Sequence, residues 1–125
     1  MTENEIAKEI LNASFEVHNT LGPGLLESVY HECLHYELNQ RGLFVEKEKS
    51  QPIVFKDAKL TAGFRIDLLV NQKVIIELKS VEQINNLHIA QTLTYLKLSN
   101  LKLALLINFN VPLLKEGIKR IAHNL

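Results

Sequence analysis

Apolar residues in the first third of the chain recur at three- and four-residue steps, which is the spacing of one face of an α-helix. The stripe that predicts a helix over residues 3–19 consists of Ile6, Ile10, Ala13, Val17 and Leu21. The sequence Gly22-Pro23-Gly24 then breaks the pattern, because proline lacks a backbone donor and glycine accepts positive φ. A second helix is expected over residues 25–40, with Gly42 just beyond its end.

The middle of the chain changes to short runs of β-forming residues. Residues 53–55 and 60–62 flank a polar turn, and residues 64–70 and 74–79 flank the sequence Asn71-Gln72-Lys73. Runs of this length with alternating polarity and a polar turn between them are typical of β-hairpins. The middle of the chain therefore predicts four strand segments.

The last third returns to helical spacing over residues 84–98, and residues 102–109 are then nearly all apolar. A continuous apolar run of this length is typical of a strand that is covered on both faces. A final helix is expected to start at Pro112, a favoured first-turn residue, and to continue through Ile118 and Ile121. The predicted order is α-α-β-β-β-β-α-β-α, an α/β (α+β) fold with a mixed β-sheet flanked by helices.

The second hairpin carries the residues that bear most on function. If its loop has two residues, Asp67 pairs with Ile76; if it has three, or contains a bulge, Asp67 pairs with Glu77 and Arg65 with Lys79. A one-residue slip moves every side chain of a strand to the other face, so burial favours the register that puts polar opposite polar. We therefore predict the longer loop or a bulge, and bulges are common beside active sites.

Two carboxylates side by side repel each other unless a cation or a proton lies between them. Mg²⁺ suits such a pair, because it prefers oxygen ligands and takes few of them from protein. A bound metal can activate water for attack on a phosphate, and Lys79 could orient that water. The alternative is an ordinary exposed hairpin whose charged face is simply solvated.

Length and composition limit the number of domains, the mode of DNA binding and the location of the protein. The 125 residues predict one domain over 1–125, and 14 basic residues balance 14 acidic ones, which argues against tight, non-specific DNA binding through phosphates alone. The lone Cys33 allows no internal disulfide, no apolar run approaches the ~20 residues of a membrane span, and the N-terminus lacks a signal-peptide pattern. We therefore expect a cytoplasmic protein that does not insert into membranes.

Three motifs, in the expected order, resemble those of the PD-(D/E)XK nuclease superfamily and, within it, the GxxExxY protein family. They are Gly24-Leu25-Leu26-Glu27-Ser28-Val29-Tyr30, then Asp67 followed by Glu77-Leu78-Lys79, and then Gln91-Thr92-Leu93-Thr94-Tyr95, which resembles the QxxxY element of RecB-like nucleases. One departure is visible, because Ile66 precedes Asp67 where the superfamily's name has a proline.

The resemblance implies a restriction-endonuclease-like fold and a hydrolase, a Mg²⁺- or Mn²⁺-dependent nuclease that acts on nucleic acid, with DNA the expected substrate. It implies that Asp67 and Glu77 are metal ligands, that Glu27 completes the metal site, that Lys79 is the catalytic lysine, and that Gln91 lines the site. Small nucleases of this kind often act in pairs, so a homodimer is expected.

Other interpretations of these residues stay open. Glu27 could cap a helix N-terminus, where the helix dipole favours a carboxylate, and Gln91 with Tyr95 could form a semi-buried polar seam. His31 and His35 are expected to be surface residues, since no zinc-protease pattern follows them. The rival to the nuclease hypothesis is a non-catalytic module that uses the nuclease fold for binding or assembly.

Overall fold

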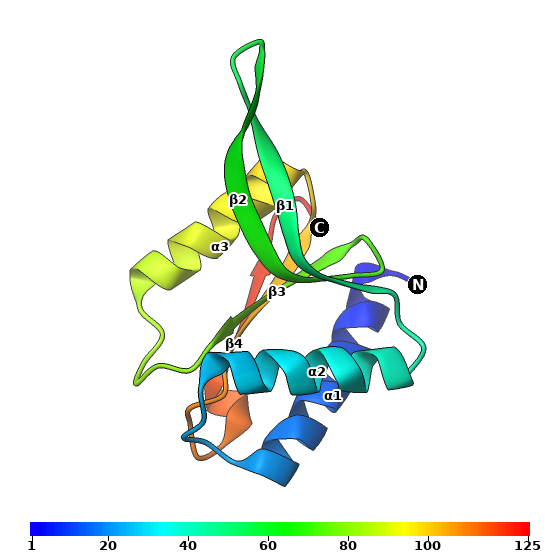
Figure 1. Cartoon of the computed structure of the whole chain (residues 1–125), viewed down its shortest axis with the longest axis vertical. Helices are drawn as coiled ribbons and strands as arrows, with labels where there is room; N and C mark the ends of the chain where they lie inside the picture. The colour runs from blue at the N-terminus through cyan, green and yellow to red at the C-terminus, as the bar shows by residue number, and fades with distance from the viewer.

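Two helices at the start of the chain pack against each other and against one face of the sheet. In the computed structural model, which describes all 125 residues, α1 spans Glu3–Leu21 and α2 spans Glu27–Gln40. A capping box formed by Thr2 and Glu5 starts α1. Both helices lie on the same side of the sheet, and α3, Asn86–Ser99, lies on the other side (Figure 1).

The sheet has five strands in the order β1-β2-β3-β4-β5. Their bounds are Val45–Phe55 for β1, Ala58–Val70 for β2, Val74–Lys79 for β3, Leu103–Asn108 for β4 and Ile118–Ala122 for β5. All neighbours are antiparallel except β3 and β4, which are parallel and joined through α3. A parallel pair needs such a crossover, because a tight turn can only join antiparallel strands.

Each face of the sheet has its own apolar core. The larger core joins α1 and α2 to alternate strand residues that include Leu68, Ile76 and Leu105. The smaller core joins α3 to the residues between them, such as Ile75 and Leu106. The mixed sheet flanked by helices confirms the predicted fold class. No helix has the combination of length and apolar character that a membrane span requires.

The predicted final helix is wrong. The chain instead makes a short 3₁₀ turn at Leu114–Gly117 and then forms β5. Ile118 packs against the larger core and Ile121 belongs to the smaller one, so the two residues serve opposite faces of a strand and not one helical stripe. Every residue of β4 is buried, and pairing with β5 gives its outer edge the hydrogen bonds that buried backbone groups require.

The two strand segments predicted on either side of Gly63 are one strand. β2 runs through Gly63 without a break and pairs with β1 along its length, with a register shift between Pro52 and Ile53. The β1–β2 hairpin extends well beyond the body of the molecule as a two-stranded projection (Figure 1). The paired strands continue because their backbone groups satisfy one another even where few side chains are buried.

Candidate active site

Strands β2 and β3 part at the two carboxylates. Val70 pairs with Val74 across a three-residue connection, which confirms the predicted loop length. The paired residues end at Leu68 and Ile76, so Asp67 and Glu77 are the next residues of their strands. The predicted pairing of Arg65 with Lys79 is wrong, because the two strands separate there and Arg65 pairs with β1 whereas Lys79 pairs with β4. The register therefore places the two carboxylates opposite each other.

The two carboxylates take over the backbone hydrogen bonds where the pairing ends. Glu77 Oε2 accepts the Asp67 N–H at 2.9 Å, and Asp67 Oδ2 accepts the Leu78 N–H at 2.8 Å. Each side chain is thus held by the backbone of the opposite strand. The second oxygen of each carboxylate accepts no hydrogen bond from the protein, so it is available to another ligand.

Strand β2 is kinked at Asp67. Ile66 packs in the α3-side core whereas Leu68 packs in the core of α1 and α2, so the alternation of faces breaks between them. Opposite the kink, Glu48 has a φ of 49° and is not paired with Asp67. The Nε2 atom of His31 lies 3.1 Å from the carbonyl oxygen of Asp67 and ties α2 to the kink. This irregularity brings Asp67 to the side of the sheet where α2 begins.

Glu27, the first residue of α2, faces Asp67. Both line a hollow of about 190 Å³ whose other lining residues are Ser28, His31, Glu32 and Glu48. Glu27 forms no hydrogen bond with the helix N-terminus, so the capping interpretation has no contact to support it. Burial raises the pKa of the Glu27 carboxyl, and the charge of Asp67 raises it further.

Tyr30 fixes the point at which α2 starts. Its ring is fully buried and stacks on Phe109, with 4.7 Å between ring centroids. Its hydroxyl donates to the Gly22 carbonyl at 2.6 Å and accepts the Leu25 N–H at 3.1 Å. These bonds close the turn before the helix, and the turn determines where Glu27 lies. The spacing of Glu27 and Tyr30 thus has a structural cause.

The electrostatics of the site disfavour negative charge. Glu77 is 5% exposed, and burial together with the charge of Asp67 raises its pKa to about 8. Burial also raises the pKa of Asp67, although the Leu78 N–H works in the opposite direction. Three carboxyl groups whose charges are all destabilised form a site that a proton or a cation would stabilise.

The remaining predicted residues are placed unequally. Lys79 is half-buried at the end of β3. Its positive charge offsets part of the rise in the pKa of Glu27, Asp67 and Glu77, although it forms no ion pair within 4.0 Å. Gln91 is exposed and its side chain makes no hydrogen bond, so no contact joins it to the carboxylates.

Tyr95 stacks on Phe64 with 4.2 Å between ring centroids. Burial raises the pKa of Tyr95, and the charges of Glu77 and Asp67 raise it further.

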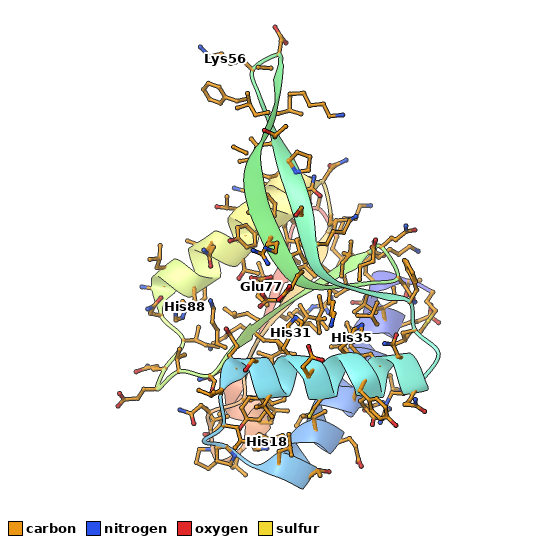
Figure 2. The ribbon with its side chains drawn as sticks, in the orientation of Figure 1. His18, His31, His35, Lys56, Glu77 and His88 are labelled. Atoms are coloured by element: carbon orange, nitrogen blue, oxygen red, sulfur yellow. The ribbon has the colours of Figure 1, made fainter.

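The expectation that His31 is a surface residue is wrong. Its side chain is only 12% exposed and it contacts the Asp67 backbone, whereas the ring of His35 bonds only to the exposed Asn39. Figure 2 shows His31 on the side of α2 that faces the sheet, with Glu77 beyond it. One signal was available, because Glu27 and His31 are four residues apart and share a helix face.

The donor set fits a hard divalent cation. No three histidine, cysteine or acidic side chains converge closely enough to form a ready-made metal cage. Mg²⁺ does not need one, since it keeps several waters and binds through one or two carboxylates. Asp67 and Glu77 offer that number of oxygens on adjacent strands, and Glu27 can add another.

The sheet thus carries two opposed carboxylates, with a lysine two residues beyond the second, at the point where the β2–β3 hairpin opens. A family model described as the PD-(D/E)XK nuclease superfamily matches residues 4–121, and the chain belongs to this superfamily. Its members generally use divalent metals, and membership implies a nucleic-acid substrate. Searches of curated proteins and of solved structures return no significant match.

Proposed function

We propose that this protein is a nuclease that hydrolyses phosphodiester bonds of DNA with Mg²⁺ or Mn²⁺. The observation that carries the proposal is the reciprocal arrangement of Asp67 and Glu77, in which each carboxylate is held by the opposite strand and keeps one oxygen free. Two buried, mutually repelling carboxylates cost stability unless they bind a cation or a proton. Their burial side by side, with Glu27 of α2 lining the same hollow as Asp67, supports a metal site.

Within the proposed site, Asp67 and Glu77 hold the metal and Glu27 completes its ligand set from the start of α2. When bound, the metal would supply an activated water and stabilise the charge on the phosphate. Lys79 orients the nucleophile or neutralises charge on the phosphate, because it lies close enough to affect all three carboxyls without being paired to any of them. Gln91, one helical turn before Tyr95, would contact the substrate from α3.

The Gly24, Glu27 and Tyr30 pattern supports placing the chain among GxxExxY proteins. The Tyr30 hydroxyl closes the turn before α2 by hydrogen bonds, and this turn positions Glu27. We also propose that the protein acts as a homodimer, since one domain of 125 residues cannot surround a duplex. Sedimentation velocity at micromolar concentration tests the dimer directly.

Cleavage of labelled single-stranded, double-stranded and branched DNA, and of RNA, tests the proposed activity. Wild-type protein should cut at least one of these with Mg²⁺ or Mn²⁺, and EDTA should abolish cutting. Glu77→Gln and Lys79→Ala should remove it, whereas the exposed controls Glu82→Gln and Lys102→Ala should not. Equal activity in wild type and in the two site variants would show that a contaminant is responsible.

A second candidate is a non-catalytic module that uses this fold for binding or assembly. The zero net charge favours it, because tight binding to nucleic acid usually needs a basic excess. Titration calorimetry separates the two candidates. A folded protein that binds neither Mg²⁺ nor Mn²⁺ would favour the module.

A further inference from the structure

The distal part of the β1–β2 hairpin has no role in the core. Residues 50–65, which we call the arm, are exposed or half-buried throughout. Lys56 lies at its tip, far from Glu77 at its base (Figure 2). A long exposed hairpin is unfavourable on its own, because it buries little apolar surface. The arm therefore suggests a binding function.

The arm is the basic part of a neutral protein. It contains Lys56, Lys59 and Arg65 against one acidic residue, Asp57, so its net charge is +2 and that of the rest of the chain is −2. Nearer the body, the basic residues of the hairpin are paired: Arg65 lies close to Glu48, Lys47 to Glu32 and Lys49 to Glu46.

Lys56 and Lys59 form no ion pair, so both tip charges are free for a ligand.

Apolar side chains are also exposed at the tip. Val54 and Phe55 are each 61% exposed, Leu60 is 41% exposed, and Lys56 lies over the Phe55 ring at 5.7 Å from its centroid. Apolar residues flanked by lysines at the end of a ribbon suit a nucleic acid, where the bases accept apolar contacts and the phosphates accept the charges.

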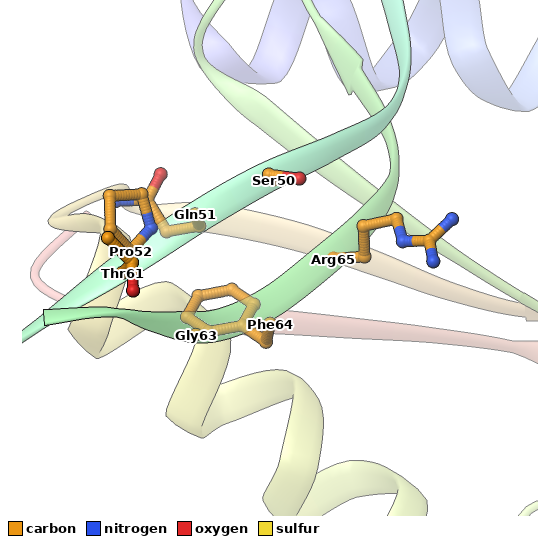
Figure 3. A pocket seen from close by; sticks show the side chains of 7 residues that line it. All are labelled: Ser50, Gln51, Pro52, Thr61, Gly63, Phe64 and Arg65. Atoms are coloured by element: carbon orange, nitrogen blue, oxygen red, sulfur yellow. The ribbon is translucent and has the colours of Figure 1, made fainter.

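The backbone gives the arm a defined twist and length. The strands approach so closely at Gly63 that a Cβ there would lie 2.0 Å from the Gln51 carbonyl oxygen, so this position requires glycine. Beside it lies an open hollow of about 480 Å³ lined by residues 50–52, 61 and 63–65, which Figure 3 shows. The hollow occupies the stretch of hairpin between the tip and Asp67.

The distance along β2 from the tip of the arm to Asp67 is close to one turn of a DNA duplex. Nine residue steps separate Asp67 from the start of β2 at Ala58, and at ~3.3 Å each they span about 30 Å. One turn of B-form DNA is about 34 Å. A two-stranded ribbon enters the major groove of B-form DNA, which is about 12 Å wide, but not the deep, narrow major groove of A-form RNA.

We propose that the arm is a DNA-binding ribbon that enters the major groove of a B-form duplex about nine base pairs from the phosphate held at Asp67 and Glu77. Lys56 and Lys59 contact phosphates and Phe55 makes apolar contact inside the groove. The inference rests on the proposed nuclease function and narrows its substrate to double-stranded DNA.

Anisotropy of a fluorescein-labelled 24-base-pair duplex, measured in EDTA over a series of salt concentrations, tests the arm. Each phosphate contact contributes about 0.9 to the slope of log affinity against log salt, so Lys56→Gln/Lys59→Gln should lower the slope by about 1.8. If wild type and the double variant bind equally at 1 M salt, a slope lower by about 1.8 means that the variant binds about 60-fold more weakly at 0.1 M salt. Phe55→Ser should weaken binding by about tenfold, which corresponds to ~1.4 kcal/mol of lost apolar burial, with the slope unchanged.

The matched control is Lys8→Gln/Lys115→Gln, which removes the same charge from exposed, unpaired lysines outside the arm. It should bind the duplex like wild type. Circular dichroism should show that all variants are folded, as expected for exposed positions. Equal affinity of the arm variant and wild type, or no duplex binding by wild type, overturns the proposal. So does an arm variant that turns a dimer into a monomer and still binds the duplex normally, because the arm would then serve a second copy.

Hydrolysis of bis(p-nitrophenyl) phosphate with Mn²⁺ reports on the carboxylate site alone, because this small diester cannot reach the tip. The arm variant should hydrolyse it like wild type. Hydrolysis by wild type with no effect of the arm on duplex binding would overturn the arm and leave the nuclease function intact. No hydrolysis of any diester, with duplex binding lost in the arm variant, would overturn the nuclease function and support the arm as a DNA-binding element.

Discussion

Replacing Glu77 with glutamine should change how stability depends on pH. The pKa of Glu77 is about 8 in the folded protein, chiefly because of burial, against an ordinary value of 4.5 in the unfolded chain. Between these values the folded state holds a proton that the unfolded state has lost, so the free energy of unfolding falls as the pH rises. The contribution of Glu77 to the free energy of unfolding is therefore greatest below pH 4.5 and is lost as the pH rises toward 8.

The size of this change in stability follows from the difference between the folded and unfolded pKa values of Glu77. One pH unit corresponds to ~1.4 kcal/mol, so an interval of about 3.5 units corresponds to about 5 kcal/mol. Domains of this size have total stabilities of roughly 5–15 kcal/mol, so the change should be easy to measure. Glutamine resembles the protonated carboxyl and does not titrate, so Glu77→Gln should become the more stable protein as the pH rises from 5 to 8.

Urea unfolding followed by circular dichroism at pH 5, 6, 7 and 8 in EDTA measures this difference, with exposed Glu82→Gln as the control. Subtracting the free energy of unfolding of wild type from that of Glu77→Gln at each pH removes the contribution of the five histidines, which both proteins share. Addition of Mg²⁺ or Mn²⁺ at 100 times its Kd at pH 8 should stabilise wild type by ~2.7 kcal/mol. Parallel pH curves for wild type and Glu77→Gln would refute the reasoning, because Glu77 would then titrate alike in both states.

Three further outcomes are expected. Lys79→Ala should bind Mn²⁺ in calorimetry with unchanged or stronger affinity, because a neighbouring positive charge is removed, but lose at least ~100-fold in cleavage rate, since that charge acts on the reacting phosphate; a normal rate would remove Lys79 from the mechanism. Tyr30→Phe should lose ~1–3 kcal/mol of stability in urea unfolding, because the Gly22 carbonyl loses its donor, and it should weaken Mn²⁺ binding through the start of α2. Gly63→Ala should lower the protection of arm amides in hydrogen exchange because the added methyl clashes with the Gln51 carbonyl, and unchanged protection would show that the strands can separate there.

The register of the second hairpin could be predicted because burial constrains it locally. Leu68, Val70, Ile76 and Leu78 must share one face, and only a three-residue connection also puts Asp67 opposite Glu77. The pairing of the two carboxylates therefore follows from alternation along two adjacent strands.

The segment after Pro112 was wrongly predicted to be a helix, because its structure depends on a strand distant in the chain and not on its own pattern. Ile118 and Ile121 are three residues apart, which suits a helical stripe as well as it suits a strand that contributes to two cores. The choice is made by β4, whose buried outer edge needs a hydrogen-bonding partner. That requirement comes from a strand ten or more residues away and leaves no mark in the local pattern.

The sequence by itself determined the helices α1, α2 and α3, the three-residue connection that puts Asp67 opposite Glu77, and the residues available to a metal, because periodicity and burial act over neighbouring positions. Only the tertiary structure decided that Glu27 and His31 meet Asp67, that Gln91 stays in solvent, and that the arm projects from the body. These outcomes depend on how α2, β2 and α3 pack against one another. Contacts between segments distant in the chain are set by the shape of the folded core, which no single stretch of sequence contains.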